Sequence, residues 1–329
     1  MVMLPDNYRL KNKKIFVAGH NGMVGSAILR LFQSQGLHCL SAERSECDFT
    51  DVIKVNEWFE KMRPDAVVIA AAKVGGIHAN DKYPVDFLLE NLKIQNNLIE
   101  AAFTHQVEKL LFLGSSCIYP KDCPQPINED SLLDGKLEET NQWYAIAKIS
   151  GLKLCQAYRK QHGADFVSLM PTNLYGPNDN FHPQNSHVPA ALLRRFHEAK
   201  ISNLDEVTVW GSGIARREFL HVDDLAMAVL HILKNYSGYN PINVGTGVDI
   251  SIKSFAELVA QIVGFEGLIC FDESKPDGTL QKRLDIKKVN ELGWRPKIDL
   301  LTGMSSVYRW TLENKIFDPC HGKSKGSFT

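Results

Sequence analysis

The amino-acid sequence predicts an α/β protein whose main domain is a doubly wound parallel sheet, followed by a smaller, partly interleaved α/β domain. Three observations indicate this fold class. Residues 14–18 form an apolar run that leads directly into a glycine-rich loop and then an amphipathic helix. Further apolar runs alternate with helical segments as far as residue 177. Beyond that point the alternation becomes irregular, which indicates a second, less regular domain.

The composition is that of an ordinary globular protein. The 329 residues are 44% hydrophobic and 23% charged, enough for one large and one small domain. A formal net charge of -1 gives no global attraction to nucleic acid, and no apolar run is long enough to cross a membrane. Residues 1–14 are polar and unlike a secretory signal. The seven cysteines include no Cys-x-x-Cys pair, so we expect reduced thiols, no metal site and a cytoplasmic location.

The glycine-rich loop has the spacing Gly19-x-x-Gly22-x-x-Gly25. A helix is expected over residues 26–35, and this order of strand, loop and helix is the context of dinucleotide binding. Small residues let the backbone approach a pyrophosphate, while the helix N-terminus supplies free N–H groups and positive potential. The alternative is a simple turn, because the spacing differs by one residue from Gly-x-Gly-x-x-Gly.

The second strand is expected over residues 38–42, and its end should face the adenosine ribose of a dinucleotide. An acid there favours NAD and a nearby arginine favours the phosphate of NADP, so Glu43 and Arg44 leave the choice open. Asp48 and Asp51 follow, and they either meet the adenine or cap the next helix.

Three more strands are expected over residues 66–70, 109–113 and 166–170. Long helices over residues 84–105 and 143–162 alternate with them, so the five strands predict a Rossmann-type sheet. Small or polar residues follow the strands, at the edge where such a sheet takes its ligand.

Tyr144 and Lys148 lie four residues apart near the start of the second long helix, so they share one face. A free tyrosine gives up its proton near pH ~10, and a nearby ammonium favours the phenolate. The pair can therefore exchange a proton with a substrate oxygen at neutral pH. The spacing alone is also typical of an exposed helical pair.

We expect residues 14–177 to form the cofactor-binding domain and residues 178–317 to be mainly a substrate-binding domain, with residues 212–245 returning in part to the first. Residues 318–329 are polar and indicate a flexible tail. The expected elements of the second domain are helices over residues 186–200, 222–234, 252–263 and 300–314 and a strand over residues 207–210.

Together these features resemble the extended short-chain dehydrogenase/reductases. The glycine loop, the cluster Gly114-Ser115-Ser116-Cys117 and the Tyr144–Lys148 pair carry the general likeness. Over residues 14–317 the chain is similar to the branch of this family that acts on GDP-linked 4-keto-6-deoxy sugars. The stretches that carry this finer likeness are residues 70–77, 113–120, 144–148, 170–177, 179–183, 185–188, 217–224 and 274–279.

The resemblance implies conversion of GDP-4-keto-6-deoxy-D-mannose to GDP-L-fucose, by epimerisation at C3 and C5 and then NADPH-dependent reduction of the C4 keto group. Inversion needs one group to remove a proton and another to return one, and Cys117 and His187 are the implied pair. A thiol and an imidazole suit this work because both can titrate near neutrality. In the reduction, Tyr144 would donate a proton to the C4 oxygen, with Ser115 as hydrogen-bond partner. Lys148 would hold the tyrosine and the nicotinamide ribose.

The resemblance also implies a site for NADP and a site for the GDP-sugar. The implied cofactor residues are Gly19, Asn21, Gly22, Met23, Val24, Gly25, Arg44, Asp48, Ala71, Leu113, Gly114, Ser115, Ser116, Lys148, Pro171, Thr172, Asn173, Leu174 and His187. The implied substrate residues are Arg195, Trp210, Arg217 and Asp277. Arginine can grip a phosphate, tryptophan can stack and aspartate can bind hydroxyls.

Each of these residues also has a plainer interpretation. Cys117 can be a small buried apolar residue, and His187 can make a local hydrogen bond at a helix N-terminus. Arg195 can belong to a solvated helix face and Trp210 to the core. Asn21 departs from the family's pattern, because better-known members carry there an arginine that helps to hold the 2′-phosphate of NADP.

Arg44 and Lys282 are candidates to replace that arginine. Two other functions remain open at this point: an NAD-dependent nucleotide-sugar 4-epimerase or 4,6-dehydratase, and a cofactor-sensing protein without catalysis. A homodimer through the helices over residues 84–105 and 143–162 is also expected, with no nucleic acid or membrane partner.

Overall fold

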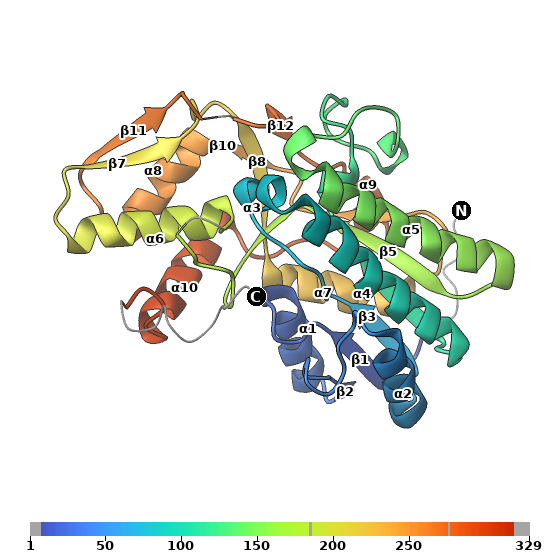
Figure 1. Cartoon of the computed structure of the whole chain (residues 1–329). Coiled ribbons are helices and arrows are strands. Elements are labelled where there is room, and N and C mark those ends of the chain that lie inside the picture. The colour runs from blue at the N-terminus through green and yellow to red at the C-terminus, as the bar shows by residue number, and fades with distance from the viewer. Residues whose placement is uncertain (1–7, 184–185, 276, 319–329) are drawn as a thin grey trace.

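The computed structural model describes residues 8–183, 186–275 and 277–318. Its centre is a six-stranded parallel sheet in the order β2-β1-β3-β4-β5-β9, with helices on both faces (Figure 1). The strands are β1 (Lys14–Ala18), β2 (His38–Leu40), β3 (Ala66–Ile69), β4 (Lys109–Leu113), β5 (Phe166–Pro171) and β9 (Ile242–Val244). The predicted Rossmann-type, doubly wound sheet is confirmed, with one strand more than the five expected.

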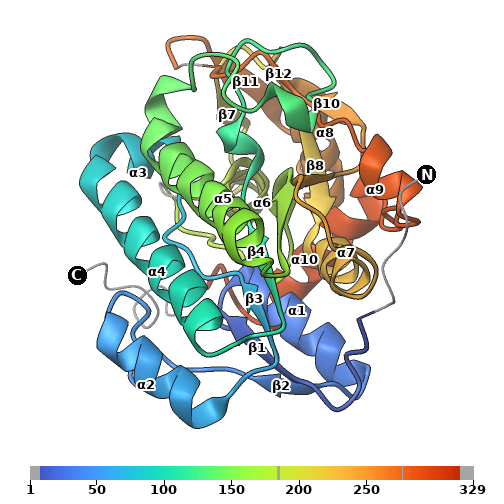
Figure 2. The ribbon, with the colours of Figure 1, turned by 90° about the vertical axis from the view of Figure 1, so that its right-hand side faces the viewer.

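Two layers of helices bury the sheet, and for this reason β3, β4 and β5 are buried at every position. One layer packs on the face that carries Phe16 and Phe112, and the other on the face that carries Val17 and Leu111 (Figure 2). The first layer is α2 (Val52–Met62), α4 (Pro84–Thr104) and α5 (Gln142–His162). The second is α1 (Met23–Ser34), α7 (Val222–Asn235) and α9 (Lys287–Glu291).

Local sequence explains several helix ends. The Asp51 carboxylate accepts hydrogen bonds from the backbone N–H groups of Ile53 and Lys54, so of its two predicted roles the structure shows the helix cap. Helix α5 ends at Gly163, whose φ of 72° is the left-handed conformation that glycine adopts at little cost. Helix α1 begins at Met23, three residues earlier than predicted, because Gly22 already serves as its N-terminal cap.

A second core lies beyond the sheet and contains Phe196, Phe219 and Phe255. The elements around it are helices α6 (Val188–Ile201), α8 (Ile252–Val263) and α10 (Leu300–Glu313), with the parallel strand pair β7 (Glu206–Trp210) and β11 (Leu268–Asp272). A further small sheet joins β8 (Arg216–His221) to β6 (Asn173–Tyr175), β10 (Asp249–Ser251) and β12 (Gln281–Lys282). In Figure 1 these elements lie to the left of and above the large sheet.

Glu218 joins the two parts of the molecule. Its side chain is fully buried on β8, and its carboxylate accepts hydrogen bonds from the backbone N–H groups of Thr246, Gly247 and Leu284. One acid thus fixes the chain after β9 and the chain after β12 to the same strand, which sets the position of β12 relative to the large sheet.

Short elements complete the fold: helix α3 (Ile77–Lys82) and the 3-10 helices η1 (Ser116–Ile118), η2 (Glu129–Ser131) and η3 (Glu139–Asn141). Within the described ranges, none of the helices is both long and apolar enough to cross a membrane. The same ranges contain no cluster of side chains suited to hold a metal ion, and their six cysteines are free. Of the predicted features, Asn185 and residues 319–329 of the tail lie outside the described residues.

Candidate active site

The glycine loop follows β1, where the sheet's strand order changes direction. Gly19 has a φ of 89°, and a Cβ atom there would lie 2.6 Å from the backbone nitrogen of Ala71 at the end of β3. Gly25 packs equally closely on the carbonyl of Gly19, whereas Gly22 faces open space with only that carbonyl oxygen at 3.6 Å. The backbone at Gly22 and at the first residues of α1, Met23 and Val24, is therefore accessible to a pyrophosphate, so the loop fits a dinucleotide.

The other implied cofactor residues follow the remaining parallel strands at the same edge of the sheet. Ala71 comes after β3; Leu113, Gly114, Ser115 and Ser116 come at the end of β4; Pro171, Thr172, Asn173 and Leu174 come at the end of β5 and in β6. The side chains of Thr172 and Asn173 both donate to the carbonyl of Glu218, at 3.3 and 2.9 Å. Those two side chains therefore hold β8 against the end of β5.

At the end of β2 the implied residues pair with one another. Asn21 Nδ2 donates to Glu43 Oε2 at 2.9 Å, and Arg44 Nε donates to Asp48 Oδ2 at 3.2 Å. The Arg44 side chain is 78% exposed. The suggestion that Lys282 replaces the missing arginine is wrong, because Lys282 lies on β12 beside Cys117, in a different part of the molecule.

Lys148 is buried beneath Tyr144. Its Nζ donates to the carbonyl of Leu113 at 2.9 Å and lies 4.9 Å from the ring centre of Phe112 and 5.7 Å from that of Tyr144. Burial lowers the pKa of Lys148 to about 8. Burial and then the charge of Cys117 raise the pKa of Tyr144 well above its ordinary value. Tyr144 keeps its proton and can donate it.

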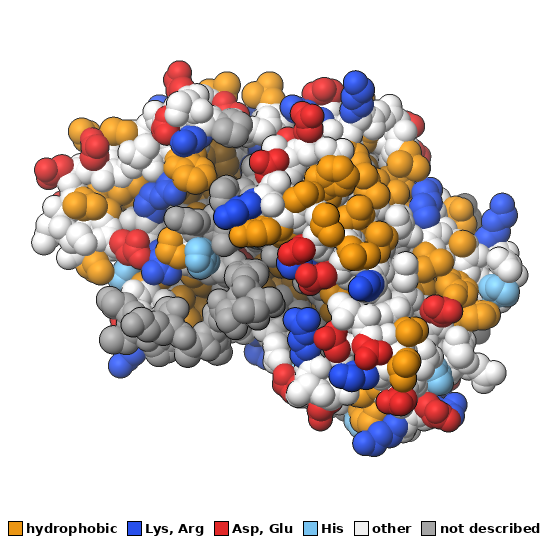
Figure 3. Space-filling view, viewed as in Figure 1, with side chains coloured by type: hydrophobic (Ala, Val, Ile, Leu, Met, Phe, Trp, Pro, Cys, Tyr) orange, Lys and Arg blue, Asp and Glu red, His pale blue; other side chains and the backbone are white. Residues whose placement is uncertain are grey.

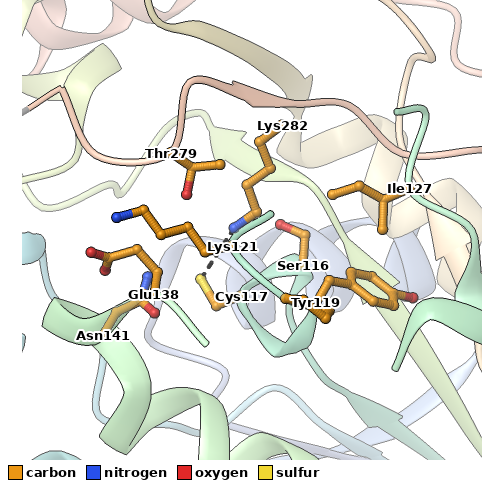
Figure 4. Close-up of a pocket in the computed structure, with 10 residues that line it drawn as sticks. Ser116, Cys117, Tyr119, Lys121, Ile127, Glu138, Asn141, Thr279 and Lys282 are labelled. Carbon is orange, nitrogen blue, oxygen red and sulfur yellow. Dashed lines mark hydrogen bonds between the residues drawn. The ribbon is translucent and has the colours of Figure 1, made fainter. Parts of the chain in front are cut away.

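Cys117 lies in η1, directly after the end of β4. The backbone N–H of Cys117 donates to Ser115 Oγ at 3.2 Å, so the serine caps the short helix that presents the thiol. Lys282 Nζ approaches Cys117 Sγ to 3.5 Å from β12, as the dashed line in Figure 4 marks. Cys117 is half-exposed and lines a pocket, so the interpretation as a buried core residue does not hold. The other residues of this pocket are Ser116, Tyr119, Pro120, Lys121, Ile127, Glu138, Asn141, Thr279 and Lys282.

His187 precedes α6 as its N-terminal cap residue, yet its side chain makes no capping hydrogen bond. Desolvation by the surrounding protein lowers the pKa of His187, and the positive charge of Lys282 lowers it further. Lys282 therefore acts electrostatically on His187 and contacts Cys117, the two residues implied in proton transfer.

The four implied substrate residues form one cluster. The Arg195 guanidinium lies 5.8 Å from the ring centre of Trp210, and Lys275 Nζ lies at the same distance. Trp210 is 54% exposed, which excludes a core role for its side chain. Arg195 also donates to the carbonyl of Thr208 at 2.6 Å, so it is held in place and is not a freely solvated side chain.

Arg217 and Asp277 link this cluster to the pocket of Cys117. Arg217 Nη2 donates to the Asp277 carbonyl at 2.9 Å, and the Asp277 carboxylate accepts from the backbone N–H and hydroxyl of Ser212, at 2.8 and 2.7 Å. Burial lowers the pKa of Arg217, while the charges of Asp277 and Cys117 act in the opposite direction. An anionic group bound between Trp210 and the pocket of Cys117 would lie near the cationic side chains of Arg195, Lys275 and Arg217.

Sequence reasoning missed three contributors to this arrangement. Lys282 was assigned to the cofactor, Lys275 was noticed only as part of a matching stretch, and Ser212 was not singled out. No local signal marks Lys282, because its partner Cys117 is 165 residues away in the chain. No local signal marks Lys275 either. It lies close to Trp210 because β11 pairs with β7, with Asp272 beside Trp210.

A dinucleotide-binding sheet, a Tyr–Lys pair at the crevice and a thiol and imidazole sharing one lysine define an enzyme that combines proton transfer with a nicotinamide cofactor. The chain belongs to the NAD dependent epimerase/dehydratase family, whose model matches residues 15–245. This agrees with the resemblance to the extended short-chain dehydrogenase/reductases.

The relatives of the chain are more specific. It is similar to GDP-L-fucose synthase 1 of Arabidopsis thaliana, 57% identical over 305 residues, with 92% of this chain and 94% of that protein covered. It is also similar to the GDP-L-fucose synthase of Escherichia coli (strain K12), 51% identical over 316 residues, with coverage of 93% and 98%. A solved GDP-L-fucose synthetase from Naegleria fowleri bound to NADP has a TM-score of 0.86 at 27% identity, with coverage of 95% and 98%. These relatives confirm the predicted branch of the family and do not favour the NAD-dependent 4-epimerase or dehydratase alternative.

Proposed function

We propose that this chain converts GDP-4-keto-6-deoxy-D-mannose to GDP-L-fucose, by epimerisation at C3 and C5 followed by NADPH-dependent reduction at C4. One observation carries the proposal: Lys282 lies 3.5 Å from the Cys117 thiol and its charge also acts on His187, while Cys117 in turn acts on Tyr144. Two groups suited to proton transfer and one proton donor thus share one part of the crevice. The names of the relatives support the substrate and the cofactor.

The epimerisation needs the C4 carbonyl polarised and the protons on C3 and C5 exchanged. Tyr144 holds its proton firmly and donates a hydrogen bond to the C4 oxygen, which stabilises the enolate. Lys282 Nζ lies 3.5 Å from Cys117 Sγ, and Cys117 acts as the base that removes a proton from the sugar. His187, whose side chain makes no capping hydrogen bond and whose pKa is lowered by desolvation, exchanges protons from the other side.

The reduction uses the same contacts on the C4 oxygen. When bound, NADPH supplies the hydride. Tyr144 transfers its proton to the developing alkoxide, and Ser115 stabilises the same oxygen by a hydrogen bond. Lys148, held by the Leu113 carbonyl, lies where it can orient Tyr144 and the cofactor ribose. The residues that would hold NADPH are those of the glycine loop and of the ends of β3, β4 and β5.

The GDP moiety is proposed to lie along the second cluster. Trp210 offers an exposed ring for stacking, flanked by two cations, Arg195 and Lys275. Arg217 is the phosphate contact nearest to the pocket of Cys117, and Asp277 is the acceptor for sugar hydroxyls. We therefore assign residues 14–177, with part of 212–245, to the cofactor-binding domain and most of residues 178–317 to the substrate-binding domain.

We further propose a cytoplasmic homodimer. Hydrophobic side chains gather on the outer face over α4 and α5, and Val85, Leu89 and Ile146 are exposed there (Figure 3). Two copies of this helix pair would bury the patch in a four-helix contact. Free cysteines suit a reducing compartment. Light scattering tests the dimer: the wild type is expected at twice the chain mass, Leu89→Glu at the chain mass, and a monomeric wild type would reject it.

The function is tested by incubating the purified chain with GDP-4-keto-6-deoxy-D-mannose and NADPH. Loss of absorbance by the reduced cofactor and identification of GDP-L-fucose by NMR are expected. Tyr144→Phe is the matched control, since it removes one hydroxyl and leaves the ring. If micromolar enzyme oxidises no NADPH, or if the chain purifies with a tightly held NAD that it recycles, the proposal is wrong.

A further inference from the structure

Glu43 lies at the position where this fold contacts the adenosine ribose of a bound dinucleotide. It follows β2 after a short connection, and its carboxylate reaches back to the glycine loop. In sheets of this kind an acid at the end of the second strand accepts a hydrogen bond from the ribose 2′-hydroxyl, which NADH has and NADPH does not.

Three hydrogen bonds fix this carboxylate and its backbone. His20 Nε2 lies 3.1 Å from Glu43 Oε1, and Asn21 Nδ2 donates to Oε2 at 2.9 Å. Because a carboxylate only accepts hydrogen bonds, Nε2 of His20 carries the hydrogen. The backbone N–H of Glu43 donates to Glu46 Oε2 at 2.9 Å. The acid is thus held beside the loop that receives the pyrophosphate, while 57% of its side chain stays exposed for a further partner.

Arg44, the next residue in the chain, carries a positive charge but forms an ion pair with another residue. Arg44 pairs with Asp48 at 3.2 Å, and Asp48 also accepts from the backbone N–H and hydroxyl of Thr50. Asn21, which stands where an arginine would face a 2′-phosphate, instead donates to Glu43. The adenosine end therefore presents the fixed Glu43 carboxylate, while Arg44 is paired with Asp48.

We propose that Glu43 sets the choice of coenzyme, so that the chain binds NADH about as well as NADPH. The inference deepens the proposed function and rests on it. The carboxylate accepts the 2′-hydroxyl of NADH, and it repels the 2′-phosphate of NADPH, which carries close to two negative charges. When the two groups are a few ångströms apart at a protein surface, this repulsion weakens the binding of NADPH by roughly tenfold.

The test is calorimetric titration of the full chain with NADPH and with NADH, without any sugar. For the wild type the two dissociation constants are expected to agree within about tenfold. Glu43→Gln removes the charge and nearly preserves the shape, and it should shift their ratio toward NADPH by roughly tenfold. Glu57→Gln removes an equal charge from an exposed position of α2 and should leave the ratio unchanged.

The proposal is overturned if the wild type prefers NADPH by more than about a hundredfold, or if Glu43→Gln leaves the ratio of the two constants where it was. Glu43→Ala is a second test variant. It removes the hydrogen-bond acceptor as well as the charge, so it should weaken the binding of NADH but not that of NADPH. The titration contains no sugar, so a negative result would not count against the proposed epimerase and reductase activity. Conversely, a lack of turnover with the sugar would not change the measured binding constants of the two coenzymes.

Discussion

Replacing Lys148 by methionine is expected to stabilise the fold while abolishing reduction. Lys148 is only 3% exposed, and burial lowers its pKa to about 8 from the ordinary 10.5. At neutral pH, that difference of about 2.5 corresponds to about 3 kcal/mol of unfavourable charge burial. Against this stands the hydrogen bond to the Leu113 carbonyl at 2.9 Å, worth about 2 kcal/mol. Methionine fills the same unbranched volume, so we expect a net gain of about 1 kcal/mol.

The pH dependence gives a sharper form of the same prediction. Because the pKa of Lys148 is lower in the folded chain, the unfolded chain binds more protons between pH about 8 and pH 10.5. The unfolding free energy contributed by this group therefore rises with pH across that window, by at most about 1.4 kcal/mol per pH unit. Below pH about 8 the cost of burial is fully present. The Lys148→Met variant lacks this rise.

Urea unfolding followed by tryptophan fluorescence at pH 7, 8, 9 and 10 measures both effects, and NADPH oxidation measures the lost reduction. The difference between the variant and the wild type should shrink and then reverse as the pH rises. A variant that is less stable than the wild type by more than about 1 kcal/mol at pH 7, or two parallel pH profiles, would refute this account of the buried ammonium.

Three further changes have direct readouts. Lys282→Met should slow alkylation of Cys117 by iodoacetamide at pH 7 by at least about tenfold, because the Lys282 ammonium lies 3.5 Å from the sulfur; peptide mass spectrometry measures the rate. Lys121→Met, in the same pocket, should have little effect, and equal rates in all three proteins would disprove the assignment. Trp210→Ala should raise KM for the GDP-sugar by roughly tenfold with kcat nearly unchanged, and a fall in kcat alone would argue against stacking. Asp51→Ala should lower the unfolding free energy by about 1 kcal/mol without affecting turnover, and unchanged stability would count against its role as a cap.

The parts of the fold that could be predicted are those whose signal is local. β1, β4 and α8 have the predicted bounds, because each has a clear apolar pattern, a continuous run in the two strands and one face of the helix, ended by a glycine such as Gly19 or Gly264. β6, β10 and β12 were not predicted. They are only two or three residues long, and their stability comes from pairing with β8, which no local pattern reveals.

The same distinction applies to the site. The residues at the ends of parallel strands could be located in advance, because the topology of a doubly wound sheet collects them at one edge. Lys282 could not, since it meets Cys117 only after β12 has paired with β8 at Arg217. The helix spacing shows that Lys148 lies near Tyr144, but it does not show that burial raises the pKa of Tyr144.

The central claim is that one set of contacts polarises the C4 carbonyl for both steps. Deuterium incorporation at C3 and C5 of the keto sugar in D2O without NADPH, followed by NMR, tests it most directly. Tyr144→Phe should slow this exchange as well as abolishing the later reduction, and Cys117→Ser should stop the exchange while its pocket remains intact. If Tyr144→Phe exchanged deuterium at the wild-type rate, the carbonyl would be polarised by some other group, and the shared site would be contradicted.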